Sequence, residues 1–148
     1  MTTKDLNALI ERLPHRPPMR MIDAVVEAAT GRAVCLVRVA DELCRLFGDG
    51  TQANAYCAIE ALAQAAAIAL AFGETENAPQ QGMLVQVGKF ESAVESFEKG
   101  STLRLEVNVD LGLGGTYALV NGQVFAGDRA LCSAKLSIAV GMGDEMEA

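Results

Sequence analysis

The segment from residue 54 to 72 constrains the fold more than any other part of the chain, because it consists mostly of alanine and larger apolar residues. Alanine has the highest helix propensity, so the composition predicts one long helix here. Asn54 can cap its N-terminus, and Gly73 can end it. Apolar residues occupy nearly every side of this helix, and a helix without a polar face is buried. The rest of the chain must therefore wrap around it.

The remaining chain supplies strands for this purpose. Residues 101–110 and 132–140 alternate strictly between apolar and polar side chains, which is typical of a sheet with one buried face. Further strands are predicted over 19–28, 32–40, 83–91 and 116–125, the last one either continuous or broken at Asn121-Gly122, and a loop over 41–53. The pattern predicts an α+β protein with an antiparallel sheet of five or six strands wrapped around one long buried central helix.

The length of 148 residues predicts a single domain over 1–148, with a short N-terminal helix at 4–13 and a frayed tail at 141–148. The first residues carry charges throughout and lack an apolar signal core, so we expect a cytoplasmic protein with reduced thiols. No stretch is expected to span a membrane, because Glu60 and Gln64 interrupt the longest apolar segment.

Composition argues against several classes of partner. The net charge of −7 and an aromatic content of 5% disfavour binding to nucleic acid or to anionic membranes. The four cysteines show no CxxC spacing and the chain has one histidine, so we expect no metal site.

Glu60 is the first candidate for a catalytic residue, because it is a carboxylate on an otherwise apolar helix. Such a group suits general acid or base chemistry near neutral pH, and the helix N-terminus nearby favours negative charge. Gln64 lies four residues further on and projects from the same face, so we expect it to support Glu60. The alternative is a structural Glu60 that pairs with an arginine across a subunit interface.

Three other residues are candidates for the site. His15, the only imidazole, is either a general acid or base or a structural group that holds the proline-rich connector at 14–18. Cys57 lies three residues before Glu60, whose carboxylate disfavours a thiolate, so we interpret Cys57 as a small core residue and a candidate substrate contact. Asp49, in the turn at 47–50, is a candidate second carboxylate for substrate binding.

Two motifs resemble the β-hydroxyacyl-acyl carrier protein (ACP) dehydratases. The segment LPHRPPMRMID at 13–23 resembles that family's Leu-Pro-His-Arg motif, which is followed by a proline and an apolar strand ending in Asp. The sequence EALAQ at 60–64 resembles the Glu-Ala-x-Ala-Gln motif of the family's central helix. The motifs occur in the family's order, and the resemblance spans residues 5–140.

The resemblance implies a hot-dog fold and a dimer whose sheets join edge to edge, with active sites at the interface and an acyl tunnel beside the helix. It implies elimination of water from a 3-hydroxyacyl thioester on ACP or CoA, in fatty-acid or polyene-lipid biosynthesis. No resident cofactor is expected, because phosphopantetheine arrives on the carrier. In the family the helix glutamate acts opposite a histidine of the partner subunit, which assigns the first role to Glu60.

The loop before the helix departs from the family pattern. The family's histidine lies in a Gly-His-Phe-Pro-Gly loop, whereas residues 46–54 contain neither His nor Pro, and Leu46 stands where the histidine would be. In this respect the chain resembles divergent dehydratase-like proteins of aryl polyene pathways. Either His15 takes the second role, or Glu60 supports weak catalysis with water and backbone N–H groups, or the protein is a non-catalytic or heterodimeric subunit that binds acyl-ACP.

Two further expectations concern activity and partners. An acyl thioesterase, in which Glu60 activates water, is another alternative to the dehydratase.

Arg16 and Arg20 belong to an arginine-rich first part of the chain and are candidates to face an acidic carrier, because complementary charge speeds encounter. We expect a homodimer, a higher hot-dog oligomer, or a heterodimer with another dehydratase.

Overall fold

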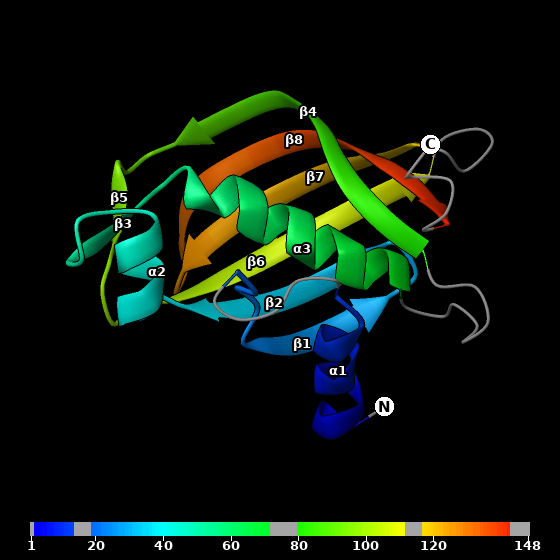
Figure 1. Cartoon of the computed structure of the whole chain (residues 1–148), viewed down its shortest axis with the longest axis horizontal. Helices are drawn as coiled ribbons and strands as arrows, with labels where there is room; N and C mark the ends of the chain where they lie inside the picture. The colour runs from blue at the N-terminus through cyan, green and yellow to red at the C-terminus, as the bar shows by residue number, and fades with distance from the viewer. Residues whose placement is uncertain (1, 14–18, 72–79, 112–116, 143–148) are drawn as a thin grey trace.

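The computed structural model describes residues 2–13, 19–71, 80–111 and 117–142. Its helices are α1 (Thr3–Ala8), the 3-10 helix η1 (Leu9–Arg12), α2 (Asp41–Leu46) and α3 (Cys57–Ala71). Its strands are β1 (Ala24–Ala29), β2 (Arg32–Arg38), β3 (Gln52–Asn54), β4 (Gln80–Ser92), β5 (Ser96–Glu98), β6 (Thr102–Leu111), β7 (Tyr117–Ala126) and β8 (Arg129–Met142). Figure 1 shows α3 lying along one face of the large sheet, with α2, β3 and β5 at one end.

The large sheet has six strands in the order β1-β2-β6-β7-β8-β4, and every neighbouring pair is antiparallel. The predicted sheet of five or six strands around a central helix is therefore confirmed. β3 and β5 form a separate two-stranded sheet, which the sequence pattern did not predict. β1 and β4 are the outer strands of the large sheet, and β8 joins β4 to β7.

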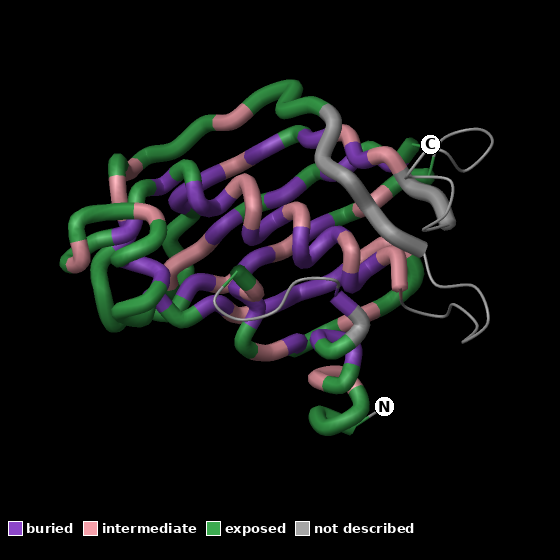
Figure 2. The backbone as a smooth tube through the Cα atoms, viewed as in Figure 1, coloured by how far each residue is buried: buried purple, intermediate pink, exposed green. Residues whose placement is uncertain are grey.

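The predicted alternation sets which side of each strand meets α3. In β6, Leu103, Leu105 and Val107 are buried while Thr102 and Asn108 are exposed. β8 repeats this pattern, and the burial colours of Figure 2 alternate along these strands. β7 runs without a break through Asn121 and Gly122.

α3 is buried along the side that faces the sheet, but not all round as predicted. Ile59, Ala63, Ala67 and Leu70 are only partly buried. The physical reason is that the sheet is a single layer, which covers one side of a helix. Within the described residues, the opposite side of α3 has no comparable layer over it.

The structure corrects two predicted boundaries near α3. The loop predicted over 41–53 contains α2 and β3, because Leu43 and Cys44 are buried on a helix that starts with acidic residues. α3 starts at Cys57 rather than at 54, because Asn54 pairs with Ser96 in the small sheet. The Asn54 side chain instead accepts a hydrogen bond from the Tyr56 N–H at 2.9 Å.

The N-terminal region follows the prediction in part. The helix predicted over 4–13 is divided into α1 and η1, and Thr2 and Asp5 form a capping box at its start. The strand predicted from residue 19 begins only at Ala24. Gly73 and residues 143–148 of the predicted tail lie outside the described residues, whereas Met142 still belongs to β8. No helix within the described ranges is long and apolar enough to cross a membrane.

Candidate active site

Glu60 lies in the first turn of α3 and is partly buried. The first N–H groups of a helix have no partner within the helix, and the helix dipole favours negative charge there. Two of these groups in α3 already donate, because the Ala58 and Ile59 N–H groups bond to backbone carbonyl oxygens just before the helix, each at 3.0 Å. This arrangement combines one proton-transferring group with the positive end of a helix dipole, which favours a developing oxyanion.

Gln64 is fully buried, with an exposed fraction of 0%, and its amide is engaged on both sides. Its Nε2 donates to Glu60 Oε1 at 3.1 Å and to the Met19 carbonyl oxygen at 2.9 Å. Its Oε1 accepts from the Met21 N–H at 2.8 Å. Gln64 therefore ties Glu60 and the backbone at 19–21 to one point on α3. This also explains why β1 starts late, since the backbone polar groups at 19 and 21 bond to a side chain instead of a strand.

A hollow of about 450 Å³ lies at the start of α3, beside Tyr56 and Phe90. Tyr56 precedes Glu60 by four residues and is 69% exposed. Its ring centroid lies 5.7 Å from that of Phe90. Sequence reasoning did not single out either aromatic residue, although the spacing of four residues from Glu60 was a usable signal for Tyr56.

Cys57 is the first residue of α3 and is buried. Burial raises the pKa of its thiol to about 12, and the neighbouring Cys132 and Cys44 act in the same direction. The thiol is therefore protonated near neutral pH and is not an activated nucleophile. This agrees with the interpretation of Cys57 as a small core residue.

Asp49 and Arg20 have partners within the described chain. Asp49 is exposed, and its Oδ1 accepts from the Thr51 hydroxyl at 2.6 Å and from the Thr51 N–H at 2.9 Å, which lowers the pKa of the carboxyl. Asp49 thus closes its own turn. Arg20 pairs with Glu11 at 3.1 Å and lines a hollow of about 490 Å³ together with Arg38.

The structure brings Glu60 and Gln64 together, as predicted, and adds the backbone at 19–21 to them. Cys57 lies one turn before Glu60 on the same helix. His15 and Arg16 lie outside the described residues. Within the described ranges no group of three His, Cys, Asp or Glu side chains could hold a metal ion.

Comparison with known proteins decides the family. The family model for the ApeP-like proteins, described as ApeP dehydratase, matches residues 8–147. The chain belongs to the ApeP-like dehydratase family. Membership in this family makes the protein a hydro-lyase of the dehydratase type and confirms the resemblance noted in the sequence.

The relatives of this ApeP-like chain agree with that assignment. A 3-hydroxyacyl-[acyl-carrier-protein] dehydratase FabZ from Staphylococcus saprophyticus is 31% identical, over 94% of this chain and 97% of the relative. A protein of the same name from Staphylococcus carnosus is 32% identical over the same shares.

Solved structures confirm the hot-dog fold. The dehydratase heterocomplex ApeI:P from Xenorhabdus doucetiae matches with a TM-score of 0.82 at 23% identity, over 94% of each chain. Zebra fish thioesterase superfamily member 2 matches with a TM-score of 0.69 at 16% identity, over 95% of this chain and 99% of that chain. At these identities, the similarity to a thioesterase concerns the fold and not the activity.

Proposed function

We propose that this ApeP-like chain eliminates water from 3-hydroxyacyl groups carried as thioesters on ACP, in the cytoplasm and without a resident cofactor. One observation carries the proposal: Glu60 stands at the start of the central helix, hydrogen-bonded to the buried Gln64. The relatives named as 3-hydroxyacyl-[acyl-carrier-protein] dehydratases support the substrate class.

Elimination of water from a 3-hydroxyacyl thioester requires a base at Cα, an acid at the 3-hydroxyl and donors for the enolate-like oxygen. Glu60 exchanges a proton with the substrate in this proposal. Gln64 fixes the orientation of the carboxylate, and the positive end of the α3 dipole stabilises the oxygen. Cys57 contributes a small buried surface beside the acyl group.

We propose further that a partner subunit supplies the second acid–base group. Residues 46–54 carry no histidine, and β4 is an outer strand of the sheet in the described chain. An outer strand presents unpaired backbone groups that can extend the sheet into a second chain. The heterocomplex that ApeP forms with ApeI in a related solved structure supports a second, different dehydratase chain as this partner.

The carrier protein approaches near the connector in this proposal. Arg20 and Arg38 line a hollow beside the backbone that Gln64 holds, together with the carboxylates of Glu11, Asp23 and Glu42. Arg16 belongs to the same connector in the sequence. Carrier proteins are expected to be acidic, and complementary charge speeds encounter more than it tightens binding.

The test measures dehydration of 3-hydroxyacyl-ACP of several chain lengths and hydration of crotonyl-CoA. The chain is assayed alone and together with ApeI, the partner chain in the related solved heterocomplex. We expect Glu60→Gln to lower turnover by about a hundredfold or more, as for a lost acid–base group. Glu98→Gln, the same change at an exposed position of strand β5, is the matched control and keeps full activity. Unchanged turnover in Glu60→Gln would contradict the proposal.

A further inference from the structure

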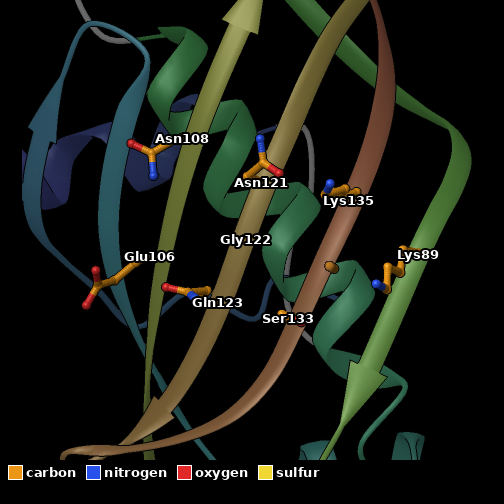
Figure 3. A pocket seen from close by; sticks show the side chains of 9 residues that line it. Lys89, Glu106, Asn108, Asn121, Gly122, Gln123, Ser133 and Lys135 are labelled. Carbon is orange, nitrogen blue, oxygen red and sulfur yellow. The ribbon is translucent and has the colours of Figure 1, made fainter.

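The face of the large sheet that is turned away from α3 carries a regular pattern of polar residues. Antiparallel pairing sets residues of neighbouring strands side by side, so each level of the sheet forms a row across the strands. Figure 3 shows the central residues of this outer face, with α3 behind the sheet. They line a hollow of about 260 Å³.

The register defines four successive rows along the strands. The first row holds Asp110, Leu119 and Ser137. The second row holds Asn108, Asn121, Lys135 and Lys89. The third row holds Glu106, Gln123, Ser133 and Glu91. The fourth row begins with Arg104 and Phe125.

The charges in these rows are separated by sign. Lys135 and Lys89 are direct cross-strand neighbours, which is an unfavourable placement for like charges. Lys89 pairs with Glu91 of the next row at 3.0 Å, whereas among the described residues Lys135 forms no ion pair. The second row is therefore basic and the third row acidic, with Glu106 of the third row paired to Arg32 and Arg104 of the same chain.

Two further features extend the pattern on either side. Leu119, in the first row, has an exposed fraction of 55%. Phe125, in the fourth row, is partly buried under the Arg104 guanidinium, which lies 4.6 Å from the ring centroid. Asp110 in the first row forms no ion pair with another described residue.

We propose that this outer face binds the outer face of a second copy of the chain, through a twofold axis that runs parallel to the rows between the second and third. A twofold axis makes an interface from the same patch on both subunits. Rotation about this axis lays the second row of one copy over the third row of the other. It also lays the first row of one copy over the fourth row of the other.

The chemistry of the central contacts is then matched. Lys89 faces Glu91 of the second copy, and Asn121 faces Gln123. In the outer pair of rows, Asp110 faces Arg104, and Leu119 faces Phe125. Sheets that pack face to face keep their strands within about 30° of each other. The proposed axis allows this, because it lays each strand over the same strand of the other copy, running in the opposite direction.

The test compares the native mass of wild type with that of two single charge reversals, by sedimentation velocity at matched concentrations. Lys89→Glu places a second carboxylate against Glu91 of the other copy, and Glu91→Lys sets two ammonium groups together. Each clash occurs twice in a twofold interface, so we expect each reversal to weaken association about a hundredfold or more and to halve the assembled mass.

Mixing the two variants gives the decisive result. In a mixed pair, both carboxylates of the Lys89→Glu chain face both ammonium groups of the Glu91→Lys chain, so an equimolar mixture regains the wild-type mass. The double swap, Lys89→Glu with Glu91→Lys in one chain, restores it as well. Circular dichroism establishes that each variant is folded.

Lys99→Glu breaks an exposed ion pair with Asp41 away from this face and is the matched control, which keeps the wild-type mass. The proposal is overturned if wild type and both reversals share one mass, or if the mixture does not reassemble. None of these readouts depends on dehydratase activity, so this experiment tests the interface independently of the proposed function.

Discussion

Gln64 shows how one amide side chain links two parts of the site. A buried polar group is tolerated when its hydrogen bonds are made, and both ends of this amide are engaged. The partners at 19 and 21 are more than forty residues away in sequence, whereas Glu60 is one turn away. The position of the carboxylate and the path of the connector therefore depend on the same residue.

Gln64→Leu keeps the approximate volume of the side chain but removes the hydrogen-bond partner of the Met21 N–H and the Met19 carbonyl. We expect the free energy of unfolding to fall by about 1–3 kcal/mol for each orphaned group. Turnover should fall too, because Glu60 loses its positioning bond. Urea unfolding and steady-state kinetics measure the two effects. Gln52→Leu, at an exposed position of β3, is the control; equal losses in both variants would argue against the linking role.

At the scale of elements, Gly122 lets helix and sheet approach each other. A Cβ at Gly122 would lie 2.9 Å from Leu62 Cδ2, and Leu62 is fully buried on α3. The glycine that suggested a break in β7 is instead a contact point inside a continuous strand. Its role is to admit Leu62, which anchors the middle of α3 to the sheet.

Gly122→Ala should therefore destabilise the fold by about 1–3 kcal/mol, the range for overpacking a filled core. Thermal and urea unfolding measure the loss. Leu62→Val in the same chain removes the crowded methyl group and should recover part of the stability. Gly88→Ala, whose Cβ would lie 3.4 Å from the Lys135 carbonyl oxygen, is the control. A double variant less stable than the sum of the single changes would refute this explanation.

At the scale of the whole molecule, the four cysteines are buried and free. Burial raises the pKa of the Cys35 and Cys57 thiols to about 12 and also raises the pKa of Cys132. Unfolded thiols ionise near pH 8.5. The unfolded state therefore releases protons at a lower pH than the folded state, and ionisation above that pH favours unfolding.

We expect the Cys35 and Cys57 thiols to leave the free energy of unfolding unchanged below about pH 8.5 and to lower it above that pH, by up to about 1.4 kcal/mol per pH unit each. Urea unfolding under reducing conditions from about pH 7 to about pH 10.5 measures this slope. Cys35→Ala removes one thiol, so the free energy of unfolding should fall less steeply with pH, by the contribution of that thiol. Equal slopes for both proteins would count against burial as the cause.

The elements whose pattern is regular were predictable from the sequence. The alternation at 101–110 and 132–140 and the alanine content of 54–72 describe local structure, so β6, β8 and α3 were recognised. α2 was missed because a six-residue helix with two buried residues has little periodicity. The start of α3 was misplaced because the pairing of Asn54 with Ser96 joins residues far apart in sequence.

For the site too, local features were predictable from the sequence and long-range contacts were not. Glu60 and Gln64 share a helix face, which spacing alone indicates. The hydrogen bonds from Gln64 to the backbone at 19 and 21 depend on tertiary packing, and no local sequence pattern predicts them. The rows on the outer face needed the strand register, which the sequence does not specify across four strands.

The position of β8 in the sheet has a consequence for synthesis on the ribosome. β4 joins the rest of the large sheet only through β8, although more than thirty residues of chain lie between the two strands. Until residues 129–142 have emerged, β4 and β7 each present an open strand edge, and open edges are sites of aggregation. The nascent chain therefore holds an incomplete sheet for most of its translation, and closure waits for one late strand to insert between two that already exist.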